Sequence, residues 1–114
     1  MICSLDTHDG VCRRLANQSG LRIASLDYRL APEHPFPAGL DDCLAALAWL
    51  RLHGAEVGID PARLALAGDS AGANLALAAC LALKQRGEEQ PRAAALIYGA
   101  FSADLDSPSH RAFG

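Results

Sequence analysis

The chain has 114 residues, of which 51% are hydrophobic and 20% charged, so its size and composition fit one globular domain and no more. The formal net charge of −3 and the scattered positions of its ten Lys and Arg residues argue against nucleic acid or an anionic membrane as a partner. No apolar run reaches the length of a membrane span, and the acidic first ten residues are unlike a secretory leader, so we expect a cytoplasmic protein.

The cysteines point to neither a disulfide framework nor a metal site. No two of them form a C-x-x-C pair, and no histidine completes a zinc-ligand spacing. We interpret them as reduced, mostly buried thiols, and we expect no metal and no organic cofactor. The four residues are Cys3, Cys12, Cys43 and Cys80.

The first third of the chain is predicted to contain a helix, a strand and a loop. Asp6 or Thr7 can cap a helix over about residues 7–19, and a glycine follows that can end it. Residues 21–27 are short and largely apolar, which is typical of a buried strand. Residues 28–37 contain three prolines, which exclude a regular helix and predict an extended loop.

Helices and strands alternate in the remainder. Leucines at helical spacing predict a helix over about residues 39–53, which a glycine ends, and a second helix is expected over about residues 71–86. Short apolar runs predict strands at residues 63–67 and 92–98. The order α-β-α-β-α-β predicts a parallel sheet with helices on both faces. A sheet of three strands leaves both edges open, so self-association through those edges is one expectation.

The strongest chemical signal is a G-x-S-x-G motif at residues 68–72, Gly-Asp-Ser-Ala-Gly, between a predicted strand and a predicted helix. A strand that turns directly into a helix forces Ser70 into a strained conformation with its side chain above the sheet. Gly68 and Gly72 remove Cβ atoms that would collide in so tight a turn. The Ser70 hydroxyl then lies at a helix N-terminus, where the Ala71 amide can stabilise an oxyanion. The motif therefore predicts a nucleophilic serine.

Two other interpretations of this motif remain open. It can be a glycine-rich connection without chemistry, because five letters of this kind also occur by chance. A phosphate-binding loop fits less well, because neither G-x-x-x-x-G-K-[ST] nor G-x-G-x-x-G is present. The strand before the motif and the helix after it favour the nucleophile.

A resemblance to a known family rests on four segments, which are residues 4–9 (SLDTHD), 27–37 (DYRLAPEHPFP), 60–63 (DPAR) and 68–76 (GDSAGANLA). Together they resemble the hormone-sensitive-lipase group of α/β-hydrolases, also called the α/β-hydrolase fold-3 family, which consists largely of bacterial esterases. The segments cover nearly the whole chain in the family's order. Ala73 is a small departure, because the family more often has glycine there.

The resemblance implies a partial α/β-hydrolase fold, with residues 1–114 as the central part of one domain. Members of the family carry His-Gly-Gly-Gly, which supplies most of the oxyanion hole, just before the segment with which this chain begins. Their triad acid and histidine follow the nucleophile by a longer distance than this chain provides. Ser70 and the Ala71 amide are therefore the only catalytic groups expected here, and the isolated chain is expected to be inactive.

No residue in the chain is a good substitute for the missing base or acid. The histidines fall at a helix start, in the proline-rich loop, at a helix end and in a polar tail, and these are His8, His34, His53 and His110. Asp69 is interpreted as a structural hydrogen-bonding residue of the turn, because adjacent side chains point apart. Asp104 and Asp106 belong to a stretch that reads as a solvated loop.

Some residues of the proline-rich loop have two interpretations. Tyr28, Arg29 and Glu33 can line a substrate pocket, but a buried Arg–carboxylate network that holds the loop against the sheet is preferred. Phe36 and Trp49 are expected to be core residues rather than a platform for a ligand.

The predicted function is hydrolysis of a small carboxylic ester through an acyl-enzyme, and the resemblance implies short-chain acyl esters. The alternative from a different class is a non-catalytic truncated remnant that binds ligands or self-associates. A weaker alternative keeps the fold and changes the reaction to amide hydrolysis or acyl transfer.

Overall fold

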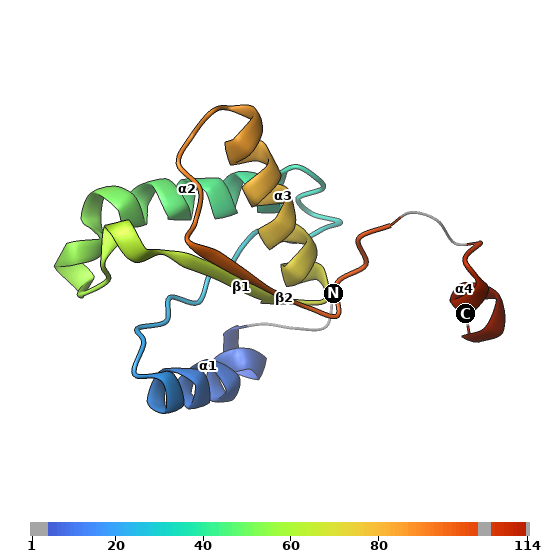
Figure 1. Cartoon of the computed structure of the whole chain (residues 1–114), viewed down its shortest axis with the longest axis horizontal. Coiled ribbons are helices and arrows are strands. Elements are labelled where there is room, and N and C mark those ends of the chain that lie inside the picture. The colour runs from blue at the N-terminus through green and yellow to red at the C-terminus, as the bar shows by residue number, and fades with distance from the viewer. Residues whose placement is uncertain (1–4, 103–105, 114) are drawn as a thin grey trace.

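Two parallel strands, with two helices packed on one of their faces, form the centre of the chain. The structure is a computed structural model that describes residues 5–102 and 106–113. Strands β1 (Ala65–Asp69) and β2 (Ala93–Ile97) pair in parallel, with Asp69 opposite Ile97 at their carboxyl ends. Figure 1 shows α2 and α3 on one side of this pair and α1 on the other. The described helices are α1 (Leu5–Ser19), α2 (Ala38–His53), α3 (Ala71–Gln85) and α4 (Pro108–Phe113), with 3₁₀ turns at Gly54–Val57 and Pro61–Arg63.

The core lies where the alanine-rich face of α3 meets α2 and the sheet. Buried residues recur along α3 every three or four positions, at Ala73, Ala76, Ala79 and Leu83. Leu47 of α2 packs against the last two of these. Alanine favours the helix and lets its backbone approach β1 closely. Ala73, where the resemblance led us to expect glycine, is fully buried, so its methyl group is part of the core.

The predicted helices are confirmed, with differences at their ends. Helix α1 begins two residues before the predicted start, which places Asp6 in its first turn rather than at its cap, and Gly20 ends it with φ +69°. Gly54 was expected to end α2, but its backbone stays right-handed and continues into a 3₁₀ turn. The left-handed residue that ends this turn is Gly58, with φ +74°.

The prediction of a strand at residues 21–27 is wrong in this structure. These residues are exposed and have no regular secondary structure, and Figure 1 shows them as an extended trace between α1 and α2. A strand needs a neighbour to satisfy its backbone hydrogen bonds. Within the described residues the sheet contains β1 and β2 alone, so this segment has no partner strand. The strand at 92–98 is confirmed, and the one predicted at 63–67 begins two residues later.

Several large apolar side chains are exposed. Phe36 and Trp49 were predicted to be core residues, but their exposed fractions are 80% and 47%. The Trp49 ring lies on the surface of α2, with its centroid 5.3 Å from that of His53. The elements that the chain provides do not cover these side chains. No described helix is both long and apolar enough to cross a membrane.

Leu83→Ala tests the position of the core. Removal of a buried leucine leaves a cavity, so we expect the free energy of unfolding to fall by about 2–5 kcal/mol. Leu81→Ala on the same helix is the matched control, because that side chain is 51% exposed and its loss is expected to cost no more than about 0.5 kcal/mol. Urea unfolding followed by circular dichroism measures both, and equal effects would contradict this core.

Candidate active site at the turn from β1 to α3

The chain turns from strand to helix at a single residue, Ser70. Its backbone angles are φ +48° and ψ −116°, a region that side-chain-bearing residues rarely adopt and that costs about 1–3 kcal/mol. The Ser70 amide donates a hydrogen bond to Ile97 O at 2.9 Å, and Ser70 O accepts from the Asn74 amide at 3.2 Å. The Ser70 side chain is exposed and does not cap α3. The predicted strained serine at a helix N-terminus is therefore present.

The two glycines of the motif have different roles. A Cβ atom on Gly68 would collide with the carbonyl group of Gly72 and would lie 2.7 Å from the Ala73 nitrogen. A Cβ atom on Gly72 would have no neighbour within 4 Å among the described residues. The prediction that both positions exclude a side chain is thus correct for Gly68 and wrong for Gly72. The close approach of the two backbones makes the turn tight.

Asp69 connects three elements beside this turn. Its Oδ2 accepts a hydrogen bond from Tyr98 OH at 2.7 Å, and His8 Nε2 of α1 lies 3.3 Å from the same oxygen. The hydrogen bond from Tyr98, and to a smaller extent the one with His8, hold the pKa of the Asp69 carboxyl below its ordinary value. The prediction that Asp69 is a structural hydrogen-bonding residue is confirmed. The sequence did not identify Tyr98 as a site residue, because its position at the end of a predicted strand was the one signal that it carried.

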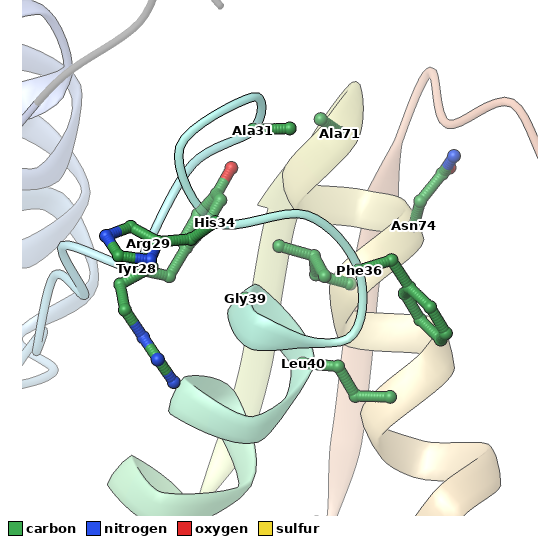
Figure 2. A pocket seen from close by; sticks show the side chains of 10 residues that line it. Tyr28, Arg29, Ala31, His34, Phe36, Gly39, Leu40, Ala71 and Asn74 are labelled. Carbon is green, nitrogen blue, oxygen red and sulfur yellow. The ribbon is translucent and has the colours of Figure 1, made fainter.

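A pocket of about 220 Å³ lies between the 28–37 loop and the first turns of α2 and α3. Figure 2 shows Ala31 of the loop and Ala71 of α3 facing each other at one end of it. Its wall is mainly apolar, and the lining residues are Tyr28, Arg29, Ala31, His34, Phe36, Gly39, Leu40, Ala71, Asn74 and Leu75. The pocket therefore reaches the residue whose amide was predicted to serve the oxyanion.

Arg29 and Asp42 hold the loop on α2. The Arg29 backbone amide donates to Asp42 Oδ2 at 2.8 Å, and its guanidinium donates to both carboxylate oxygens at 2.8–3.0 Å. These hydrogen bonds lower the pKa of the Asp42 carboxyl. A buried network of Arg29 with Glu33 was predicted, but the partner is Asp42, Glu33 is exposed, and the Arg29 side chain is half-exposed. Tyr28 and Arg29 line the pocket, as the other interpretation of the loop expected, whereas Glu33 does not.

None of the described histidines forms a hydrogen bond with Ser70 in the structure. His53 Nδ1 lies 2.9 Å from Glu56 Oε1, and His110 Nδ1 lies 2.8 Å from Ser107 Oγ. His34 lines the pocket, and His8 contacts Asp69. Asp106 is exposed, and the other acidic candidate, Asp104, lies outside the described residues.

The described cysteines and acidic residues give no sign of a metal centre. Within the described residues, no three His, Cys, Asp or Glu side chains group closely enough to hold a metal ion. Cys12, Cys43 and Cys80 are free, half-buried thiols, whereas Cys3 lies outside the described residues. Burial raises the pKa of both the Cys43 and the Cys80 thiols, so neither is an activated nucleophile.

Comparison with known proteins places this geometry in a family. A family profile described as alpha/beta hydrolase fold matches residues 1–114. Carboxylesterase NlhH of Mycobacterium tuberculosis is 47% identical over 105 residues, which cover 92% of this chain and 33% of that protein. Ethyl acetate hydrolase of Pseudomonas putida is 41% identical over 116 residues, which cover 100% of this chain and 36% of that protein.

A solved structure gives the same result. The ester-hydrolase EH1AB1 from the metagenome of Lake Arreo, in complex with a derivative of bipyridine phosphonate, superimposes with a TM-score of 0.92 at 48% identity. The match covers 98% of this chain and 36% of that one. The chain thus spans about a third of the length of the relatives that it matches.

Gly68→Ala and Gly72→Ala form a matched pair that tests the tight turn. Gly68→Ala is expected to lower the free energy of unfolding by about 1–3 kcal/mol, because its methyl group collides with the backbone of the next helix. Gly72→Ala should stay within about 1 kcal/mol of the original chain, because its methyl group meets open space. Urea unfolding measures both changes. If Gly72→Ala lowered the free energy of unfolding more than Gly68→Ala, the close contact between Gly68 and Gly72 would not be what makes the turn tight.

Asp42→Asn tests the anchor of the loop through its pH dependence. The pKa of Asp42 is lower in the folded chain than in the unfolded chain. The ionised carboxylate therefore stabilises the fold fully when the pH is above the unfolded pKa of about 3.9. This stabilisation is lost as the pH falls through the folded pKa. The variant should be less stable at neutral pH and should lose less stability between about pH 5 and 2. Asp41→Asn, which leaves the Arg29–Asp42 pair intact, is the control in the same urea titrations. An acid dependence that Asp42→Asn leaves unchanged would contradict this anchor.

Proposed function

The chain belongs to the α/β-hydrolase fold family, and from this premise we propose that Ser70 is the nucleophile of a carboxylic ester hydrolase. The observation that carries the proposal is the strained backbone of Ser70 between β1 and α3, with an exposed side chain that does not cap the helix. Backbone strain of this kind clusters at active sites. The names of the relatives, which are carboxylesterases and other ester hydrolases, support the same reaction.

The proposed ester hydrolysis begins at Ser70. Its Oγ attacks the ester carbonyl carbon while a histidine takes the hydroxyl proton, and the carbonyl oxygen becomes an oxyanion. The Ala71 amide, at the positive end of the α3 dipole, donates to that oxygen. Collapse of the tetrahedral intermediate breaks the bond to the alcohol, which leaves with the proton. Water then attacks the acyl-enzyme and releases the acid.

The remaining catalytic groups are proposed to come from sequence beyond these 114 residues. The chain supplies about a third of the length of its relatives, and no described histidine is bonded to Ser70. The glycine-rich oxyanion loop, the triad acid and the triad histidine are assigned to the other two thirds. The isolated chain would then hold a nucleophile without a base. A cytoplasmic location stays a prediction from the sequence.

The pocket beside Ala71 is proposed to receive one substituent of the ester. It is mainly apolar, and it meets the turn at the residue that serves the oxyanion. The preference for short-chain esters stays a prediction from the family resemblance.

Self-association is a second candidate function, and one observation favours it. The sheet has two strands within the described residues, so the other edge of β1 carries backbone groups without a strand partner. Exposed apolar side chains such as Ile97 and Phe101 follow β2 or lie in it. Sedimentation of the 114-residue chain tests this candidate, because association through the open edge would give oligomers, whereas a monomer would contradict it.

A chimera tests the esterase proposal. The matched third of carboxylesterase NlhH is replaced by this chain, so that the relative supplies the missing groups, and hydrolysis of p-nitrophenyl acetate is measured. We expect activity in the chimera and a loss of at least about a thousandfold in kcat with Ser70→Ala, because the nucleophile is essential. Ser25→Ala, on an exposed segment far from the motif in sequence, is the matched control and should keep the activity.

Three outcomes would contradict the proposal. A chimera that folds by circular dichroism but hydrolyses no ester would remove Ser70 from ester chemistry. Activity that survives Ser70→Ala would place the nucleophile elsewhere. Faster turnover of p-nitroacetanilide, or transfer of the acyl group to an added alcohol in preference to water, would change the reaction class to amide hydrolysis or acyl transfer.

A further inference from the structure

Two adjacent turns at the carboxyl end of the sheet each contain a non-glycine residue with a positive φ. Ser70 follows Asp69 at the end of β1, and Tyr98 follows Ile97 at the end of β2. Asp69 and Ile97 are register partners, so the two residues after them lie side by side. Both have positive φ, +48° for Ser70 and +39° for Tyr98, and within the described residues they are the only non-glycine residues that do. Such strain persists only where the surroundings hold it.

The contacts that hold these turns cross from one to the other. The Ser70 amide donates to Ile97 O at 2.9 Å, and Tyr98 OH donates back to Asp69 Oδ2 at 2.7 Å. Gly99, next to Tyr98, lies so close to α3 that an added Cβ atom would be 2.9 Å from Asn74 Oδ1. Each strained turn therefore rests on the other and on the first turn of α3.

His8 ties a third element to this pair. Its Nε2 lies 3.3 Å from Asp69 Oδ2, and its Nδ1 lies 3.1 Å from the hydroxyl of Thr7. The His8 and Asp69 side chains are both about two-thirds buried, with exposed fractions of 31% and 33%. Among the described residues, His8 and Tyr98 are the titratable groups bonded to the Asp69 carboxylate.

We propose that Asp69, with Tyr98 and His8, is a positioning residue that holds the strained backbone of Ser70 by joining the ends of β1 and β2 to the start of α1. The negative charge of Asp69 contributes to this positioning, because a phenol donates a stronger hydrogen bond to a carboxylate than to a neutral acceptor. The inference rests on the proposed role of Ser70 as a nucleophile. The test measures hydrogen exchange at the Ser70 backbone amide, so it can support this inference even if the chain hydrolyses no ester.

Hydrogen exchange of the Ser70 amide in the 114-residue chain is the test. Tyr98→Phe removes one hydroxyl, and we expect it to reduce the protection factor of this amide roughly tenfold while that of Leu83 in the core is unchanged. Tyr28→Phe removes the same group from the loop before α2 and should leave Ser70 protected. His8→Leu should weaken the protection, and His8→Gln, which keeps a side-chain N–H, should restore part of it.

The pH profile separates positioning by charge from simple packing. The pKa of Asp69 is lowered in the folded chain, so protection of the Ser70 amide should be constant near neutral pH and should fall as the pH drops through the folded value. Asp69→Asn should make this fall smaller over the same range, because the carboxamide does not titrate there while the Asp42 carboxyl still does.

Any of three results would overturn the proposal. The first is a Ser70 amide that exchanges as fast in the original chain as in an unfolded one. The second is protection that Tyr98→Phe leaves unchanged, or lowers equally at Ser70 and Leu83. The third is a fall in protection at low pH that is the same with Asp69→Asn.

Discussion

The close approach of the Gly68 backbone to Gly72 is the constraint on which the rest of this structure depends. It lets the chain pass from β1 to α3 at one residue, and it leaves Ser70 as the residue that absorbs the change of direction. Because α3 leaves the strand so abruptly, it lies back against β1, and its Ala79 and Leu83 meet Leu47 of α2 in the core. The candidate nucleophile and the hydrophobic core therefore follow from the same turn.

A core built on alanine is compact but buries little surface. Ala73, Ala76 and Ala79 bring the α3 backbone close to the strands, and each contributes only a methyl group to the core. Larger apolar side chains such as Phe36 and Trp49 are exposed, because the elements that this chain provides do not reach them. The chain matches relatives about three times its length with a TM-score of 0.92 for one of them, so this arrangement is the one adopted within a larger fold.

The local features of this fold were predictable from the sequence, and the pairings between distant segments were not. Helix α3 and the strain at Ser70 follow from a motif with a strand before it and a helix after it. Residues 21–27 are largely apolar, as β1 is. A strand forms only beside a neighbouring strand, and the composition of a segment does not show which strand that is. The bond from Tyr98 to Asp69 spans 29 residues and depends on the register that places Asp69 opposite Ile97, which no local pattern encodes.

The conformation of Ser70 and the activation proposed for it have separate origins in this molecule. Ser70 is strained without any hydrogen bond to a described histidine, so the backbone of β1 and α3, and not a general base, sets its geometry. The conformation is supported within the chain by Ile97 and by the Asp69–Tyr98 pair. The proposed activation requires an imidazole aligned on Oγ, and none of the described histidines is hydrogen-bonded to Ser70. The shape of the turn at Ser70 is therefore set locally, independently of the group that is proposed to activate this serine.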